Sequence, residues 1–436
     1  MPVTIARPHL LRGEITAPGD KSISHRAVIF NAISHTGTAH VTNFSPGADC
    51  SSTVEILRSL GVEIQRIPGK NSIGDHLTVK GVGLHGLQEP SVVLDAANSG
   101  TTTRLMSGIL AGRNILTILT GDDSLKSRPM KRVVEPLTRM GAVISGRASN
   151  TLVPLVFHGG SLTGTHHEMP VASAQLKSCL LAAGLRADGP TTLTQAAESR
   201  DHTERMFSAM GVKLEVTGLD LKLEPSELET VNVEVPGDIS SAAFWMVAGI
   251  CHPDAEILIK NVGTNPTRAG IITALKMMGS DLTLVDEREV AGEPVADVFV
   301  RTSQLEAIEL SGDIIPLLID EIPIIAVAAA FATGTTIVRD ASELRVKESD
   351  RIQASVSWMN GAGVEAEETD DGMIIPGAGS IGGGMFRSSN DHRVAMSIGV
   401  AGLLSDSPIT IIDPDVAGIS YPGFWETINE LGGIVE

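Results

Sequence analysis

The 436-residue sequence is poor in aromatic side chains, which make up 3% of it and include a single Tyr. A surface that binds nucleic-acid bases by stacking is therefore not expected. The chain is not deficient in hydrophobic residues, which account for 42% of it, so intrinsic disorder is excluded as well. The length predicts two or three folded domains.

Cysteine is also scarce. Cys50, Cys179 and Cys251 lie far apart and fit neither a disulfide framework nor a paired metal motif. The start of the chain lacks the basic and apolar regions of a secretory signal, and the longest apolar stretch, 322–333, is too short to span a bilayer. These features favour a reduced, cytoplasmic protein without a membrane segment.

Basic residues are outnumbered, since 33 Lys and Arg stand against 52 Asp and Glu for a formal charge of −19. This balance argues against nucleic acid or an acidic membrane as the main partner, and any anionic ligand would need a locally basic pocket. No GxGxxG follows a predicted strand, so no dinucleotide cofactor is expected. No metal-ligand constellation is recognised either, and 166–168 (HHE) is predicted to be an exposed polar loop.

An internal repeat is the most informative feature of the sequence. A helical apolar pattern that ends in a glycine and continues into a strand recurs six times, at intervals of 68 to 84 residues. Each glycine stands where a helix C-cap needs a left-handed residue. The six marker glycines are Gly61, Gly141, Gly211, Gly279, Gly363 and Gly432.

Each repeat reads as strand, helix, strand, helix and further strands. The two halves of the chain also match, because APGDKSIS at 17 and VPGDISSA at 235 lie 218 residues apart. We therefore predict two globular domains of three units each rather than an extended solenoid. The predicted boundaries place 21–237 in the first domain and 1–20 with 238–436 in the second.

Polar and basic residues recur at two positions of the repeat, the start of the small-residue helix and the loop after the second strand. Helix N-termini facing one cleft would form an anion site, and Arg binds carboxylate or phosphate in bidentate fashion. The pattern predicts a ligand with more than one phosphate or carboxylate, held between the domains. The loop residues are Lys126, Arg128, Ser199, Arg200, Arg268, Arg345, Lys347, Glu348 and Arg351.

Five segments carry a family resemblance: PGDKSISHRA at 18, NSGTTTRL at 98, SRP at 127, ELRVKESDR at 343 and NDHRVAMS at 390. In order and spacing they resemble the signature segments of the enolpyruvyl transferases, and the resemblance covers essentially the whole chain. It implies an α/β (α+β) fold of two domains, each with three βαβαββ units in an inverse α/β barrel-like arrangement, and ligands in the cleft between them.

The resemblance also implies a reaction. The enolpyruvyl group of phosphoenolpyruvate would be transferred to the 5-hydroxyl of shikimate 3-phosphate by addition and elimination of phosphate, without metal or organic cofactor. Asp320 resembles the group that takes the hydroxyl proton, and Glu348 the donor and acceptor at the methylene carbon. Lys21 resembles a residue that touches both substrates and acts as an acid, a role that depends on a depressed pKa.

The substrate-binding residues follow from the same resemblance. Arg128, Arg351 and Arg393 match a clamp on phosphoenolpyruvate, with Gly100 allowing close backbone approach. Lys347 would help to hold the attacking hydroxyl. The full predicted binding set is Lys21, Ser22, Arg26, Asn98, Gly100, Arg128, Ser173, Ala174, Gln175, Ser199, Arg200, Asp320, Lys347, Arg351, His392 and Arg393.

The sequence departs from one branch of the family. That branch has a second serine at Ala174, a proline at Leu105 and a lysine at Ile419, and Arg200 is expected to compensate for the lost charge. Two alternatives stay open. One is transfer to UDP-N-acetylglucosamine, although residues 114–130 lack the cysteine usual for that activity. The other is a non-catalytic anion-sensing repeat protein. The family is expected to be monomeric.

Overall fold

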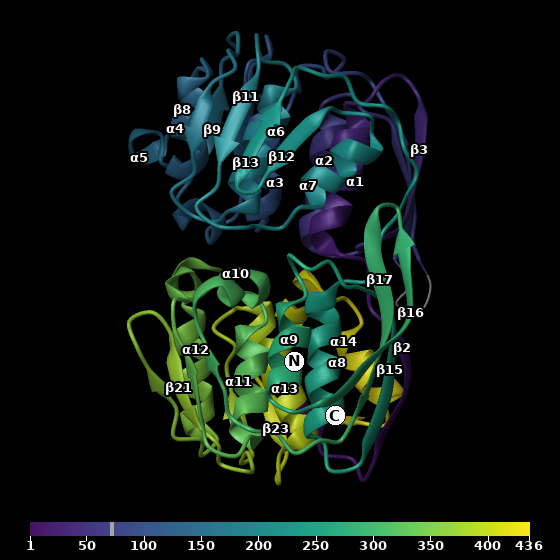
Figure 1. The fold of residues 1–436 in the computed structure, drawn as a ribbon, viewed down its shortest axis with the longest axis vertical. Coiled ribbons are helices and arrows are strands. Elements are labelled where there is room, and N and C mark those ends of the chain that lie inside the picture. The colour runs from purple at the N-terminus through teal and green to yellow at the C-terminus, as the bar shows by residue number, and fades with distance from the viewer. Residues whose placement is uncertain (70–73) are drawn as a thin grey trace.

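The computed structural model describes residues 1–69 and 74–436, and Figure 1 shows them as two globular halves, one above the other. Each half has its own hydrophobic core. The core of the upper half is built from residues between 23 and 235. The core of the lower half combines residues 5–17 with residues 239–431. The N-terminal strands therefore pack with the second half of the chain.

Every sheet in the described part of the chain has four strands, and there are six such sheets. The sheet of the third repeat unit along the chain shows the pattern plainly. Its strand β10 (His166–Glu168) runs parallel to β11 (Thr191–Thr194), and β11 is antiparallel to β13 (Asp220–Leu223). Strand β12 (Leu214–Thr217) pairs with β13 at the edge of the sheet. Two helices lie between these strands in the chain, namely α6 (Ala174–Gly184) and α7 (His202–Ala209). The predicted order of strands and helices is confirmed.

The other sheets follow the same scheme. The remaining upper-half strands are β3 (Thr38–Phe44), β4 (Ile64–Ile67), β5 (Asp75–Lys80), β6 (Leu94–Asp95), β7 (Thr117–Thr120), β8 (Ile144–Gly146), β9 (Leu152–Phe157) and β14 (Val233–Glu234). The lower-half strands are β1 (Val3–Ala6), β2 (Leu11–Thr16), β15 (Ala255–Gly263), β16 (Asp281–Val290), β17 (Glu293–Arg301), β18 (Glu309–Leu310), β19 (Thr335–Val338), β20 (Glu367–Glu368), β21 (Met373–Pro376), β22 (Gly384–Phe386), β23 (Ile409–Ile411) and β24 (Ile434–Val435).

The helices of each half pack against one another. Those of the upper half are α1 (Lys21–Ala32), α2 (Ala48–Ser59), α3 (Gly100–Leu110), η1 (Leu125–Ser127), α4 (Lys131–Arg139) and α5 (Arg147–Asn150), together with α6 and α7. Those of the lower half are α8 (Ile239–Cys251), α9 (Gly270–Met277), η2 (Gly312–Ile314), α10 (Ile315–Leu318), α11 (Ile322–Phe331), η3 (Ser342–Val346), α12 (Arg351–Gly361), α13 (His392–Leu404), η4 (Pro414–Ile419) and α14 (Phe424–Glu430).

The six marker glycines all occupy the left-handed region of the backbone. Their φ angles lie between 79° for Gly211 and 107° for Gly141. Each follows the end of a helix and precedes the edge strand of its unit, as in Gly61 between α2 and β4. A residue with a Cβ is strained at such a φ, so glycine ends the helix cheaply there. The predicted C-caps are confirmed.

The two matching segments at 17 and 235 are the places where the chain crosses between the halves. They run side by side, because the Asp20 amide donates to Pro236 O at 2.7 Å and the Asp238 amide donates to Pro18 O at 2.7 Å. A Cβ on Gly19 would lie 1.8 Å from Asn43 O, so the first crossover requires glycine where it passes β3. Asp20 and Asp238 then cap the first turns of α1 and α8.

The crossovers coincide with the division between the two cores. The predicted domain boundaries, 21–237 and 1–20 with 238–436, stay a prediction. Within the described residues, no single helix is long and apolar enough to cross a membrane; only a pair bent by 110°, Gly312–Leu318 with Ile322–Phe331, passes on length and composition.

Candidate active site

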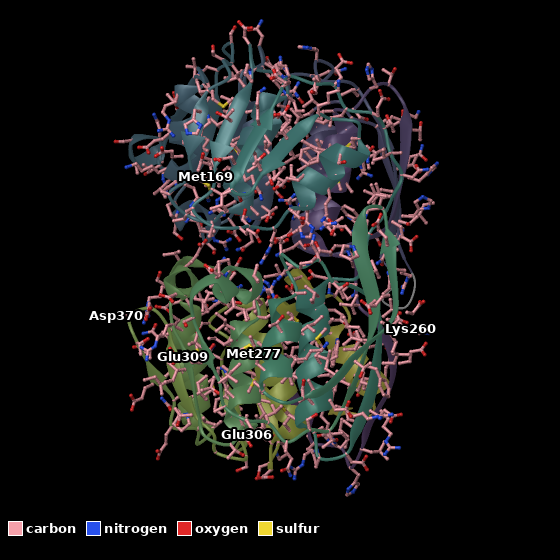
Figure 2. The ribbon with its side chains drawn as sticks, in the orientation of Figure 1. Met169, Lys260, Met277, Glu306, Glu309 and Asp370 are labelled. Atoms are coloured by element: carbon pink, nitrogen blue, oxygen red, sulfur yellow. The ribbon has the colours of Figure 1, made fainter. Side chains whose placement is uncertain are left out.

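A cavity of about 330 Å³ lies between the two halves and is lined by residues of both. Figure 2 shows side chains of both halves reaching into the boundary region. Sixteen of the seventeen predicted site residues line this cavity: Lys21, Ser22, Arg26, Gly100, Arg128, Ser173, Ala174, Gln175, Ser199, Arg200, Asp320, Lys347, Glu348, Arg351, His392 and Arg393. Asn98 instead lies behind Arg128, whose Nη2 donates to Asn98 Oδ1 at 2.6 Å.

The cavity is basic in a chain that is acidic overall. Among the described lining residues, ten are Lys or Arg and six are Asp or Glu, which leaves a formal charge of +4. The chain as a whole carries −19. Such a local excess of positive charge favours small ligands with several negative charges.

Helix N-termini contribute to this character. The first residues of α1, α3 and α6 (Lys21, Gly100 and Ala174) line the cavity together with those of α12 and α13. Free amide groups and the positive end of the helix dipole face anions at such termini. A Cβ on Gly100 would lie 3.0 Å from Arg104 Nη1 and 3.6 Å from Arg128 Nη1, so glycine keeps the space in front of both guanidinium groups open.

Arg351 organises the carboxylates of the lower half. Its side chain is 1% exposed, and it places Nη1 3.1 Å from Asp320 Oδ1 and Nη2 2.6 Å from Glu348 Oε2. Its Nε donates to Asp391 Oδ2 at 2.8 Å. Asp391 in turn caps α13, so the guanidinium is fixed from behind and holds two cavity carboxylates in front.

Both carboxylates are ionised in this environment. Burial by itself would raise the pKa of Asp320, but Lys347, Arg393, Arg200 and Arg351 together hold it well below its ordinary value. Burial likewise opposes ionisation of Glu348, yet Arg351 and other nearby cations hold its pKa well below the ordinary range. Asp320 lies between α10, which ends at Leu318, and α11, which begins at Ile322.

Lys21 differs from the expectation of a depressed pKa. Burial lowers the pKa of its ammonium group, but the nearby Asp49 carboxylate and Glu348 together more than offset this, and the net shift is upward. Nζ of Lys21 lies 3.1 Å from Asp49 Oδ2. Lys21 is therefore protonated in this cavity, and the expected depression of its pKa is wrong because no spacing in the sequence indicates that Asp49 lies beside it.

Three ion pairs among the described residues bridge the cavity from one half to the other. Arg200 Nη2 lies 2.6 Å from Asp320 Oδ2, Arg128 Nη1 lies 3.5 Å from Glu348 Oε1, and Arg132 Nη1 lies 3.4 Å from Glu343 Oε1. Each pairs an upper-half arginine with a lower-half carboxylate. Anionic ligands would compete with these carboxylates for the arginines.

The cavity also contains charged residues that the sequence reasoning missed. Asp49, Arg132, Asp238 and Glu343 line it, although none was predicted as a site residue. Arg104 does so too, and burial with neighbouring Arg132 and Arg128 lowers its pKa to about 10. Two predicted basic loop residues point elsewhere: Lys126 pairs with Asp123 and Arg345 with Asp350, both outside the cavity lining.

Comparisons with known proteins agree with this geometry. The sequence model of EPSP synthase (3-phosphoshikimate 1-carboxyvinyltransferase) matches residues 5–428. A 3-phosphoshikimate 1-carboxyvinyltransferase of Chloroflexus aurantiacus is 50% identical over 431 residues, covering 98% of each chain. One of Herpetosiphon aurantiacus is 49% identical over 435 residues, covering 99% of each chain.

Solved structures indicate the same family. An EPSP synthase from Acinetobacter baumannii superposes with a TM-score of 0.88 at 42% identity, covering 100% of this chain and 99% of that one. Its fold confirms the predicted α/β class, and neither alternative function left open above is favoured by these relatives. The chain belongs to the EPSP synthase (3-phosphoshikimate 1-carboxyvinyltransferase) family.

Proposed function

We propose that this enzyme carries out its family's reaction in the cavity between the halves, with Asp320 and Glu348 as acid–base groups. The reaction transfers the enolpyruvyl group of phosphoenolpyruvate to the 5-hydroxyl of shikimate 3-phosphate and releases phosphate, in aromatic biosynthesis. One observation carries the assignment of roles: Arg351 holds both carboxylates at the edge of a cavity that has a net positive charge.

Asp320 is the proposed acceptor of the hydroxyl proton. A general base must be ionised, and the cations around Asp320 keep it so at neutral pH. Lys347 Nζ lies 3.8 Å from Asp320 Oδ1, close enough to help position an attacking hydroxyl between them. The oxygen of that hydroxyl then adds to the carbon that bears the phosphate of phosphoenolpyruvate.

Glu348 is the proposed partner of the methylene carbon, and it must carry a proton before the addition. Its pKa lies well below the ordinary range because Arg351, Arg128 and Lys21 favour the ionised form. The carboxylate and phosphate of phosphoenolpyruvate would neutralise part of that charge and raise the pKa of Glu348. Glu348 would then donate a proton to the methylene carbon and recover it when phosphate leaves.

Lys21 is the proposed acid of the elimination. It is protonated beside Asp49 and lies at the first turn of α1, where its ammonium group faces the cavity. A proton from Lys21 would neutralise the departing phosphate, and the cations around it would stabilise the charge that develops on the phosphate oxygens.

The proposed binding roles divide between the two substrates. Arg128, Arg351 and Arg393 would bind phosphoenolpyruvate, with Gly100, Lys347 and His392 beside it and Asn98 positioning Arg128. Shikimate 3-phosphate would bind to hydroxyl, amide and guanidinium groups of the upper half. Those contacts are Ser22, Arg26, Ser173, Gln175, Ser199 and Arg200, with the Ala174 amide at the start of α6.

The proposed route calls for no metal or organic cofactor, because the chain itself supplies the acid, the base and the cations.

We also propose that the protein acts as a monomer in the cytoplasm. Both walls of the cavity come from one chain, and the three cysteines are free thiols. Light scattering during gel filtration tests the monomer, and a stable dimer would contradict it.

The acceptor is tested by following phosphate release from phosphoenolpyruvate with shikimate 3-phosphate and, in parallel, with UDP-N-acetylglucosamine. We expect release with shikimate 3-phosphate alone. Release with UDP-N-acetylglucosamine instead would overturn the assignment of the acceptor. Binding of both shikimate-pathway substrates without any release would favour an anion-sensing protein.

A further inference from the structure

Lys177 is a buried lysine just outside the active-site cavity. It lies in the first turn of α6, four residues after Ser173, and its side chain is 1% exposed. Lys177 does not line the cavity, although residues 173–175 at the start of the same helix do. It is also the only charged residue of α6. Its position beside the proposed substrate contacts calls for a physical explanation.

The amine of Lys177 has two partners. Nζ lies 2.5 Å from Glu204 Oε1, on α7, and donates to Ser199 O at 3.0 Å. Glu204 does not line the cavity either, whereas Ser199 does. Among the described residues, Lys177 is the only hydrogen-bond donor to the Ser199 carbonyl. Burial lowers the pKa of Lys177, and Glu204 opposes this shift. The lysine therefore links α6 to the loop between β11 and α7.

That loop presents two of the proposed substrate contacts. Residues 195–201 join β11 to α7 and include Ser199 and Arg200, which both line the cavity. The Ser199–Arg200 peptide is planar, so a hydrogen bond to its carbonyl restrains the rotation of the whole unit. The Ser199 hydroxyl is held separately, because it donates to Gln195 Oε1 at 2.6 Å. Lys177 thus holds, from outside the cavity, the backbone that carries both side chains.

Stability alone does not account for a charged pair at this position. Taking an ammonium and a carboxylate out of water costs free energy, and replacing a buried ion pair by apolar residues is often neutral or stabilising. An apolar residue at 177 would continue the buried pattern of Leu176, Leu180 and Leu181. Such a residue could not donate a hydrogen bond to Ser199 O.

We propose that Lys177 is a positioning residue for shikimate 3-phosphate and acts through the Ser199–Arg200 peptide. This inference rests on the proposed function, because it assigns Ser199 and Arg200 to that substrate. Glu204 then balances the charge of the buried ammonium and does not itself hold the loop. Loss of the donor at 177 should therefore weaken binding of shikimate 3-phosphate, whereas loss of the charge at 204 should not.

The test removes the ion pair in two steps. Glu204→Gln keeps Lys177, whose amine remains a donor in either protonation state, so the KM for shikimate 3-phosphate should stay within about threefold of normal. Adding Lys177→Met removes the donor and leaves no unpaired charge, and this KM should rise roughly tenfold. In both variants kcat and the KM for phosphoenolpyruvate should change by less than about threefold. Calorimetric titration of shikimate 3-phosphate should show the same loss without turnover.

Further variants separate positioning from a general effect on the fold. Urea unfolding should show the double variant to be folded, and Lys177→Gln with Glu204→Gln is a second form of the same deletion that should raise the KM equally. Combination with Arg200→Gln should raise the KM by less than the product of the separate effects, because both changes act on one contact. Lys222→Met, which removes an exposed lysine of the same half, should leave the KM unchanged.

Three results would overturn the inference. They are a normal KM for shikimate 3-phosphate in both double variants, an equal rise in Glu204→Gln alone, and effects that multiply fully with Arg200→Gln. If the unmodified protein bound no shikimate 3-phosphate, the proposed function would fail and the inference with it. Normal binding by the unmodified protein and by the double variants would remove the inference alone.

Discussion

The two walls of the active-site cavity differ in charge. The upper wall, formed by lining residues between 21 and 200, contains six basic and one acidic described side chains. The lower wall, formed by lining residues between 238 and 393, contains four basic and five acidic ones. The upper wall is thus suited to binding anions, whereas the lower wall holds the carboxylates that can move protons. In the proposed assignment the two carboxylates that move protons, Asp320 and Glu348, lie in the lower wall, whereas most of the cations of the cavity lie in the upper wall.

The largest effect on the catalytic rate is expected from a substitution in the lower wall. Asp320→Asn removes the proposed base while keeping the shape of the side chain, so we expect kcat to fall roughly 10²- to 10⁴-fold with little change in KM. Steady-state phosphate release measures both parameters. Asp313→Asn, an identical change at an exposed position in the same half, is the control and should behave as the unmodified enzyme. A loss confined to KM would move Asp320 from catalysis to binding.

A change in the upper wall should affect binding instead. Arg200→Gln removes one cation and its 2.6 Å contact with Asp320, and we expect the KM for shikimate 3-phosphate to rise by roughly 10- to 100-fold. The change in kcat should be several-fold at most. Lys126→Gln, which removes a cation outside the cavity, should leave both parameters unchanged. If Arg200→Gln lowered kcat as strongly as Asp320→Asn, the division between the walls would be wrong.

The proposed phosphoenolpyruvate clamp should also govern domain closure. It draws Arg128 from the upper wall and Arg351 and Arg393 from the lower wall, and closure brings these cations together only when anionic substrates compensate their charge. We expect the radius of gyration from solution X-ray scattering to fall when both ligands, or their analogues, are added. An unchanged radius would mean that the charge on the walls does not control their separation.

The smallest effect concerns His392, which is neutral and so adds nothing to the charge of the lower wall. Burial lowers its pKa to about 4. Between pH 6.5 and 4 the unfolded chain binds a proton that the folded protein does not, so stability falls as the pH falls. Relative to His392→Gln, the unmodified protein should lose about 2 kcal/mol more between pH 7 and pH 5.

Urea unfolding at the two pH values measures this difference, and His166→Gln provides an exposed histidine as control. Equal pH dependence of the His392→Gln variant and the unmodified protein would show that His392 has the same pKa in the folded protein as in the unfolded chain. The lower wall would then gain a positive charge as the pH falls below about 6.5.

Much of the fold could be predicted because it depends on local chemistry that repeats. A helix end that needs a left-handed residue selects glycine six times. The crossovers at 17 and 235 share the PGD sequence because each has a glycine at a close backbone approach and an aspartate that caps the next helix. A short run of polar residues was a poorer guide to local structure. Residues 166–168 were predicted to be an exposed loop, but they form β10, and His167 is buried with a pKa of about 4 because burial disfavours its charged form.

Most of the site could be predicted as well, because helix starts and loops at matched repeat positions converge in space. The ion pairs could not. Asp49 lies 28 residues from Lys21 and Glu343 lies 211 residues from Arg132, so nothing in the spacing indicates that these side chains meet. Partners set the pKa values, and this is why the protonation of Lys21 was predicted wrongly.

The most direct test of the division between the walls measures binding and rate separately in one lower-wall variant. For Glu348→Gln, equilibrium binding of shikimate 3-phosphate should be retained or tightened, since a negative charge is removed from a cationic cavity, while single-turnover phosphate release should fall at least 100-fold. Glu309→Gln, at the side of the lower half in Figure 2, should match the unmodified enzyme. Lost binding or a nearly normal rate in Glu348→Gln would contradict the account.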